Sequence, residues 1–337
     1  GLNDRDLDKL DERWSEISQR ITADTKADYE FDHFVRHVLL VEYDIEEKKD
    51  DLYKGLQQVI KKKGKKPQEV INDLERWSKD FEKLRRPDTE PLWQYEETKN
   101  FLILLKKIKA INAYPPLMAG YRKFHLKKDY KTFKKLTELL FKYQVRVRQI
   151  INETDSKISE TTKDITKKIG EGKDWNEIIK PIKEQESNTQ PVFEASAAGF
   201  ATSRPEVVRY ILENVKGEQK IAEVDIEHIM PLSWTEWEKD IIKWKGYRSL
   251  TPEQQGPRIR KYHKDHKYLI GNQMLLEKSI NRSIGDSSFK KKRKAYVTSV
   301  FSDAKKIGKS KTKWTDKEIL ERQKNLQKTI IALFTIK

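Results

Sequence analysis

The sequence contains no cysteine among its 337 residues. This absence excludes disulfide bonds, a cysteine nucleophile and any zinc site built on thiolates. No apolar run approaches the ~20 residues that a membrane-spanning helix needs, and the first residues show no signal-peptide pattern. We therefore expect a soluble cytoplasmic protein with no membrane partner.

Apolar residues make up 36% of the chain, aromatic residues 10% and charged residues 37%. This mixture is typical of a globular, strongly solvated protein rather than a disordered one. The length is sufficient for two domains, each with its own core.

The net charge of +16 is distributed unevenly. Residues 278–337 contain 17 Lys and Arg against 5 Asp and Glu, whereas the first 220 residues contain 44 against 40. Such an excess favours a polyanionic partner, most simply nucleic acid. A lysine-rich solvated surface without a partner is the alternative.

The first two hundred residues show apolar side chains at helical spacing. The run from Phe101 to Ile111 is apolar nearly all round, and it predicts a buried central helix that Pro115 and Pro116 end. Short polar segments predict breaks between helices; they are KKKGKK at 61–66, GEGK at 170–173 and ESNTQP at 186–191.

The composition changes near residue 190. Ser203 to Glu206 reads as a capping box that opens a helix, and Ile221 to Ile229 reads as a strand. A last helix opens with the box Thr315 to Glu318 and ends near Phe334. We predict a mainly α protein, with an all-helical domain at 1–195 and a small α+β domain at 196–337.

The segment IAEVDIEHIMPLSW, residues 221–234, places an acid beside an imidazole at the end of the predicted strand. Alternation puts Asp225 and Glu227 on one face and His228 on the other. A neutral imidazole can accept a proton from water, which makes His228 a candidate general base. A carboxylate such as Glu227 suits Mg²⁺ or Mn²⁺. A structural histidine at a strand end is the alternative.

Two asparagines follow downstream in a lysine-rich frame, Asn272 and Asn281. An asparagine carbonyl can bind a hard cation, and its amide can orient a neighbouring group. One base, carboxylates, two asparagines and many cations are what a one-metal phosphodiesterase needs. Asn281 could instead be an ordinary turn residue.

The order DIEHIMP, then IGNQMLL, then a second asparagine nine residues after the first, resembles the HNH (ββα-metal, His-Me finger) nuclease core. With SSFKKK and Tyr296 it is similar to the C-terminal nuclease domain of the GmrSD-like modification-dependent restriction enzymes, such as the phosphorothioate-sensing SspE type. The similarity covers residues 204–334, and the helical region before it resembles the middle part of that family. The opening GLNDRDLDKLDERW resembles the end of the family's N-terminal domain.

The resemblance implies roles for the matching residues. His228 would be the general base, Asn272 would help to fix the site, and Glu227 and Asn281 would bind a divalent cation, Mg²⁺ or Mn²⁺. Asp225 would be a further ligand or a supporting residue. The residues that would contact DNA phosphates are Arg282, Lys290, Lys291, Lys292 and Arg293.

One departure from the family's pattern concerns a histidine. Many relatives have a histidine just before the Gly-Asn pair, where this chain has Tyr268. His263 and His266 lie nearby at a shifted spacing. The role of the long stretch from 235 to 266 stays open.

The activity implied is a DNA nickase with 5′-phosphate products, the effector part of a bacterial antiviral restriction enzyme. Its partners would be double-stranded DNA, an N-terminal nucleotide-hydrolysing sensor domain of the same protein, and a second copy in a homodimer. IGKS at 307–310 has Asp303 where a phosphate-binding loop needs glycine, so we predict a solvated loop there. The alternatives are an RNase, or a DNA-binding or regulatory module with a degenerate nuclease core.

Overall fold

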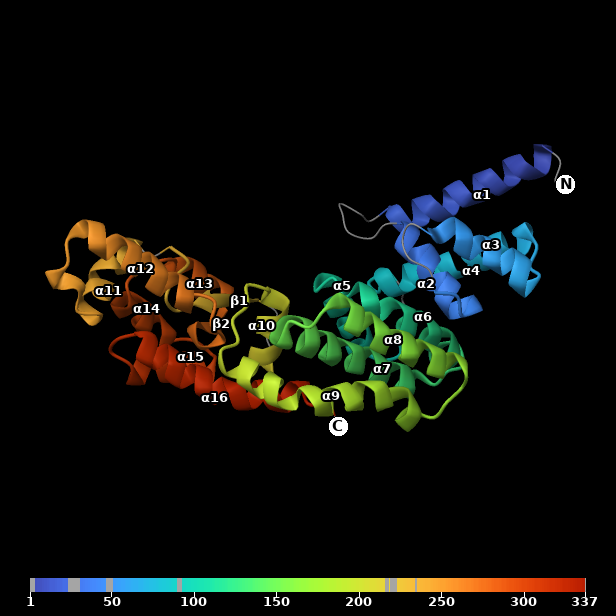
Figure 1. The fold of residues 1–337 in the computed structure, drawn as a ribbon. Coiled ribbons are helices and arrows are strands. Elements are labelled where there is room, and N and C mark those ends of the chain that lie inside the picture. Colours follow the sequence, from blue (N-terminus) through green and yellow to red (C-terminus); the bar gives the residue numbers. More distant parts are fainter. Residues whose placement is uncertain are drawn as a thin grey trace. The chain divides into compact units, whose positions relative to one another are not determined.

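A computed structural model describes residues 4–23, 31–46, 51–89, 93–215, 218, 223–233 and 235–336. The chain divides into two compact units (Figure 1). The first contains residues 1–148 and 152–188, and the second contains residues 189–335 with the short segment 149–151. The predicted boundary at 195/196 and the observed one at 188/189 both lie within one helix, α9 (Trp175–Ala198).

The first unit is helical throughout its described part, and no described helix in the chain is long and apolar enough to cross a membrane. Its helices are α1 (Asp4–Thr22), α2 (Phe31–Tyr43), α3 (Leu52–Lys63), α4 (Pro67–Arg85), α5 (Glu96–Lys107), α6 (Tyr114–Gly120), α7 (Tyr130–Gln144), α8 (Asp155–Gly170) and the first part of α9, with short turns η2 (Ile111–Ala113), η3 (Tyr121–His125) and η4 (Val145–Ile151). The predicted mainly α class is confirmed.

Two expectations for this unit were wrong. Pro115 and Pro116 do not end a helix; they lie in the first turn of α6, where proline's missing N–H is no loss. The segment ESNTQP does not separate two helices either, since it lies inside α9. Phe193 and Ala197 are fully buried one turn apart, and this packing overrides the weak helix preference of the polar residues.

The second unit combines short helices with one small sheet. Its elements are α10 (Pro205–Glu213), β1 (Val224–His228), η5 (Thr235–Trp237), α11 (Glu238–Trp244), η6 (Tyr247–Ser249), α12 (Pro252–His266), η7 (Ile270–Asn272), β2 (Gln273–Glu277), α13 (Lys278–Ile284), α14 (Phe289–Tyr296), α15 (Ser302–Ser310) and α16 (Asp316–Phe334). The last of these begins with the predicted capping box, in which Thr315 and Glu318 bond each other's backbone.

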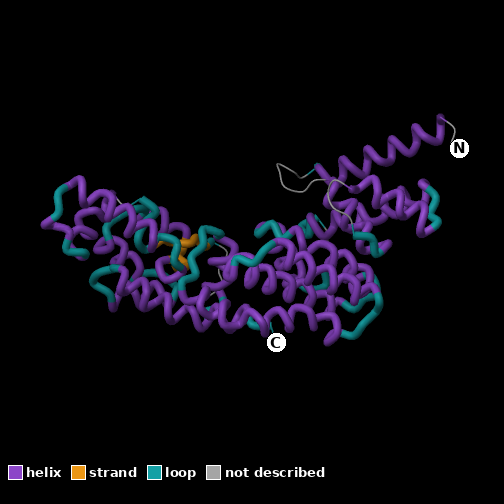
Figure 2. The backbone as a smooth tube through the Cα atoms, in the orientation of Figure 1, coloured by secondary structure: helices purple, strands orange, loops and turns teal. Residues whose placement is uncertain are grey.

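β1 and β2 form a two-stranded antiparallel sheet among the helices (Figure 2). The register pairs Asp225 with Leu276 and His228 with Gln273. The predicted strand from Ile221 to Ile229 is shorter at both ends than expected, and Ile221 lies outside the described residues. β2 runs directly into α13, which packs against both strands.

Two local predictions in this unit were wrong. The helix α10 begins at Pro205 with Arg204 as its N-cap, so Ser203 does not cap it; the Thr202 hydroxyl accepts a hydrogen bond from the Arg204 N–H instead. IGKS is the last turn of α15 rather than a solvated loop. A Cβ on Gly308 would lie 2.8 Å from the Arg293 carbonyl oxygen, so this glycine permits close helix packing.

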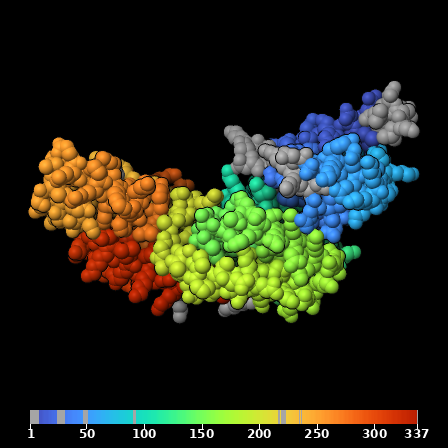
Figure 3. Space-filling model, in the orientation of Figure 1, coloured from blue at the N-terminus to red at the C-terminus, as the bar shows by residue number. Residues whose placement is uncertain are grey.

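A single core holds the second unit together. Trp237, Tyr296 and Trp314 are almost completely buried in it. The Lys245 ammonium bonds the Asp316 carboxylate at 2.8 Å, which ties the region before α12 to the start of α16. On the face in Figure 3 the orange surface of residues near 250 borders the red surface of the C-terminal helices.

Candidate active site

The sheet and α13 bring together residues that are far apart in the sequence. Asp225 is the second residue of β1, and Asn281 lies one turn into α13. The Asn281 amide nitrogen is 3.5 Å from an Asp225 carboxylate oxygen. Two of the predicted metal ligands are therefore neighbours, because β2 delivers α13 directly alongside β1.

Glu227 lies two residues further along β1 and is 4% exposed. Its Oε1 accepts hydrogen bonds from the Lys292 ammonium at 2.7 Å and from the Tyr296 hydroxyl at 2.6 Å. Burial raises the pKa of the Glu227 carboxyl, and the positive charge of Lys292 offsets part of that effect. Both hydrogen bonds end on Oε1, so they leave Oε2 outside this network.

The placement of Lys292 differs from the expected contact with DNA phosphates. Its side chain is completely buried, where it pairs with Glu227 and also bonds the His228 carbonyl oxygen at 2.9 Å. The reason is helical spacing: Phe289, Lys292 and Tyr296 occupy one side of α14 and face the core. A lysine at a buried position of an apolar stripe is the signal in the sequence that could have revealed this role.

The other predicted phosphate-contacting residues lie nearer the surface. Lys290, Lys291 and Arg282 are exposed, whereas Arg293 is half-buried and donates a hydrogen bond to the Gly308 carbonyl oxygen at 3.3 Å. Arg322, which carries charge in the same region, bonds Asp303 and the carbonyl oxygens of the Gly271 turn.

His228 ends β1 and is half-buried. Its ring packs edge-on against Tyr268, with 5.9 Å between ring centroids. Its Nε2 is buried and has no hydrogen-bond partner among the described residues. Burial, followed by the positive charges of Lys292 and Lys267, lowers the pKa of His228 to about 4. The imidazole is therefore neutral near pH 7 and has a nitrogen that can accept a proton.

Asn272 is fully buried and holds the chain that follows His228. Its Oδ1 accepts hydrogen bonds from the Met230 N–H at 2.8 Å and the Trp314 indole N–H at 3.1 Å. Its amide donates to the carbonyl oxygens of Met230 and Lys267. These four bonds use the whole capacity of the side chain, so Asn272 positions the site and does not contact a substrate.

His263, which sequence reasoning left without a role, supports the same segment. It is 4% exposed, and its Nε2 lies 2.7 Å from the Pro231 carbonyl oxygen. The Nδ1 of His266 lies 2.6 Å from the Tyr262 carbonyl oxygen of its own helix. His266 makes no hydrogen bond with Glu227, His228 or Asn272 in the described structure. The stretch from 235 to 266 therefore contributes at least one side chain, His263 in α12, that fixes the exit from β1.

No group of three or more His, Asp and Glu side chains in the described part of the chain could hold a metal ion. The available oxygen donors are Asp225, the free Oε2 of Glu227 and, after a half-turn of its amide, the Oδ1 of Asn281. Mg²⁺ is commonly held by one or two carboxylates and keeps several waters. The donor set thus fits a hard cation of this kind.

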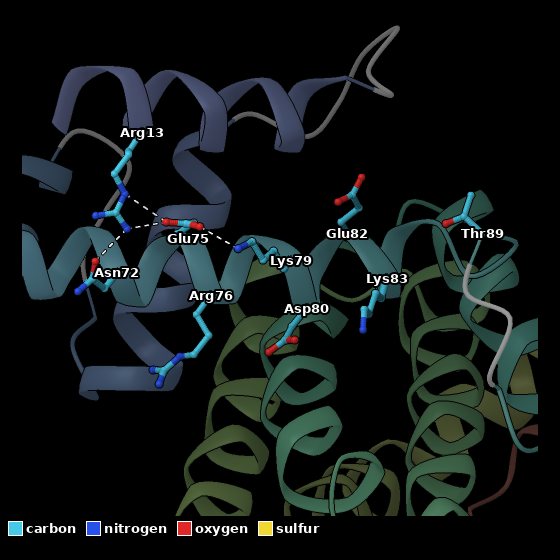
Figure 4. A pocket seen from close by; sticks show the side chains of 9 residues that line it. All are labelled: Arg13, Asn72, Glu75, Arg76, Lys79, Asp80, Glu82, Lys83 and Thr89. Carbon is cyan, nitrogen blue, oxygen red and sulfur yellow. Dashed lines mark hydrogen bonds and ion pairs between the residues drawn. The ribbon is translucent and has the colours of Figure 1, made fainter. Parts of the chain in front are cut away.

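A hollow in the first unit offers no such arrangement of donors. It has a volume of about 770 Å³ and lies along α1 and α4 (Figure 4). Its charged side chains are directed at each other: Arg13 bonds Glu75 and Asn72, and Lys79 bonds Glu75. We regard it as a surface groove between paired helices.

The half-buried His228, the neighbouring pair Asp225 and Asn281, and the order β1, β2, α13 all belong to the second unit. Residues 188–329 match the sequence model of the C-terminal domain of the GmrSD restriction endonucleases. The C-terminal part of the chain is therefore GmrSD-like, which indicates a nuclease domain of the restriction endonuclease type. No curated protein matches the chain significantly. The match starts next to the observed unit boundary and does not distinguish the phosphorothioate-sensing type, which stays a prediction.

Proposed function

We propose that the second unit is a metal-dependent DNA endonuclease of the HNH type, in which β1, β2 and α13 form the ββα core. The observation that carries the proposal is the buried Nε2 of His228, which has no partner among the described residues, at the end of the strand that also carries Asp225. The similarity of residues 188–329 to a restriction endonuclease domain supports DNA as the substrate.

In the proposed mechanism, His228 accepts a proton from the water that attacks the phosphorus. Its low pKa keeps the acceptor nitrogen free near neutral pH. Asn272 fixes the backbone after the histidine, and Lys292 holds the carbonyl oxygen of His228 itself. The base is thus held from both sides, so little reorientation is needed for the reaction.

Asp225, Glu227 through Oε2, and Asn281 would hold a divalent cation, Mg²⁺ or Mn²⁺. When bound, such an ion would neutralise charge on the scissile phosphate and on the departing 3′ oxygen. Lys292 would keep Oε1 of Glu227 occupied and so present the other oxygen to the ion. Products would carry 5′-phosphate and 3′-hydroxyl ends.

One site of this kind cuts one strand, so a single chain would nick DNA and a double-strand break would need two copies. In the bacterial cytoplasm the chain would be the effector of an antiviral restriction system. A nucleotide-hydrolysing sensor domain and a homodimer remain proposals drawn from the family resemblance.

The test is a plasmid assay with Mg²⁺ or Mn²⁺. Wild-type protein is expected to convert supercoiled plasmid to open circle, and EDTA to abolish the conversion. His228→Ala should lose roughly 10²–10⁴-fold in rate, the usual contribution of a general base. His266→Ala changes the same residue type outside the cluster and should retain activity.

Two outcomes would contradict the proposal. Binding of plasmid without nicking by the wild type would indicate a degenerate core that serves as a DNA-binding module. Cleavage of RNA of similar length in preference to plasmid would assign the site to an RNase.

A further inference from the structure

α14 and α15 present lysines with the same spacing. In α14 the exposed lysines are Lys290, Lys291 and Lys294; in α15 they are Lys305, Lys306 and Lys309. Each set occupies the first, second and fifth positions of a five-residue stretch, which places it on one side of its helix. Between them the helices bury Lys292 and the pair Ile307–Gly308, so both sets stand on the solvent side.

No described carboxylate forms an ion pair with any of these six lysines, and the only one of them that acts electrostatically on a described acid with a shifted pKa is Lys306, on the Glu321 carboxylate that Lys311 already pairs. None of them forms an ion pair or a side-chain hydrogen bond with a described residue, in contrast to Lys311, which pairs with Glu321. From Phe289 to Thr315 the only acidic residue is Asp303, and Arg322 holds it at 2.6 Å. The positive charge of this surface is therefore available to an external anion.

Close helix packing makes the two lysine sets one surface. A Cβ on Gly308 would lie 2.8 Å from the Arg293 carbonyl oxygen and 2.9 Å from the Val297 nitrogen, so only glycine allows α15 to approach α14 this closely. The short connection from Val297 to Phe301 keeps the helices adjacent. α14 in turn is fixed to the end of β1, because Lys292 bonds the His228 carbonyl oxygen.

The composition of the surface decides what it can recognise. Its other exposed side chains on the two helices and their connection are small, namely Val297, Thr298, Val300, Ser302 and Ser310. Arginine, asparagine and glutamine, the residues that read base edges in a groove, are absent from the exposed positions. Lysine acts as a point charge toward phosphate and carries no sequence information.

We propose that this lysine surface, residues 290, 291, 294, 305, 306 and 309, binds the backbone phosphates of duplex DNA next to the cut site without regard to sequence. The proposal rests on the endonuclease function above and extends the predicted contacts from α14 to α15. It assigns most of the affinity for DNA to this surface and leaves the choice of target to another part of the system.

The experiment measures DNA affinity against salt for the full chain carrying His228→Ala, which prevents cleavage. The test variant is Lys305→Gln/Lys306→Gln/Lys309→Gln. Its control is Lys61→Gln/Lys62→Gln/Lys63→Gln, which removes the same charge from exposed lysines at the end of α3. The test variant should bind a random duplex at least about 10-fold more weakly, with a log–log salt slope shallower by about 3.

Equal losses in the two triple variants would overturn the proposal, because net charge rather than this surface would then control binding. An unchanged affinity of the test variant for DNA would also overturn it. So would a variant that binds anionic vesicles more weakly but DNA as tightly as before, because the surface would then serve a membrane. The nicking assay with unmodified His228 is independent: activity there, with no effect of the α15 lysines on binding, would retain the nuclease and reject the surface.

Discussion

At the scale of single residues, the geometry of the candidate active site depends on a charged pair that is buried among apolar side chains. Lys292 and Glu227 are both almost fully buried, and the Tyr296 hydroxyl completes the set. Such a pair gives little net stability compared with apolar residues of the same shape, but removal of one partner leaves an uncompensated charge. The pair therefore acts mainly by fixing where the end of β1 lies.

Replacement of Lys292 by methionine should destabilise the second unit by about 3–5 kcal/mol, because Glu227 would remain buried without its partner. Urea unfolding followed by tryptophan fluorescence measures the loss. Lys291→Met, at the exposed neighbouring position, should change stability by less than about 0.5 kcal/mol. The interpretation fails if the two variants have the same unfolding midpoint.

Adding Glu227→Gln to Lys292→Met should recover part of the lost stability, since an amide is cheaper to bury than an unpaired carboxylate. The double variant should still nick plasmid poorly, because Glu227 loses the charge with which it would bind the cation and the carbonyl oxygen of His228 lacks its lysine. Full recovery of nicking would contradict the proposed roles of both residues.

At the scale of elements, α15 depends on Gly308. A methyl group there meets backbone atoms of α14, which cannot move aside as a flexible side chain could. Gly308→Ala is expected to cost about 1–3 kcal/mol through overpacking. Gly199→Ala in the same unit meets nothing within 4 Å and should be neutral or slightly stabilising. Thermal unfolding of the two variants side by side decides the point.

The stability that the ion pairs between α1 and α4 provide depends on pH, and the direction of this dependence follows from the pKa of Glu75. Hydrogen bonds from Lys79 and Arg13 lower the pKa of Glu75 to about 2. A lowered folded-state pKa gives stability that is present above pH 4.5, the unfolded value, and is lost as the pH falls toward 2. Because the side chain is partly exposed, the effect should stay below about 1 kcal/mol.

The measurement compares wild type with Glu75→Gln by urea unfolding at pH 7, 4 and 3. The difference between them should shrink steadily over this range and should also shrink with added salt. A constant difference across pH would contradict the assignment of the ion pairs drawn in Figure 4.

Helix periodicity and the last capping box were sufficient to predict the mainly helical class and the last helix, α16, because apolar spacing and local hydrogen bonds determine them. Two of the errors, at ESNTQP and at IGKS, come from tertiary packing that acts on a locally weak segment. Phe193 and Ala197 continue α9 through a polar stretch, and Gly308 serves a helix contact that local sequence does not show. Asp225 lies beside Asn281 because of the register between β1 and β2, which the sequence alone did not reveal.

The residues of the candidate site could be predicted because they cluster in short motifs. Their hydrogen-bond partners could not be predicted, since Lys292 is 64 residues from His228 and Trp314 is 42 residues from Asn272 along the chain. A lysine in a basic run is usually solvated, so only its place on the apolar stripe of α14 distinguishes Lys292.

At the scale of the whole molecule, the chain consists of two units with separate cores. A fragment from residue 174, which retains all of α9, is expected to fold and to nick plasmid when supplied with Mg²⁺ or Mn²⁺. Circular dichroism and the plasmid assay check the two parts of this prediction. A folded but inactive fragment would mean that the first unit contributes to catalysis.

The long-range contacts of the site have a consequence for the protein during its synthesis on the ribosome. Asp225, Glu227 and His228 are synthesised early in the second unit, but Lys292, Trp314 and Gln323, which bonds the Gly271 N–H, come last. A nascent or prematurely terminated chain therefore has the motif without its supports. If the domain cuts DNA as proposed, the host that translates it is protected until α16, which carries Gln323, has emerged and folded.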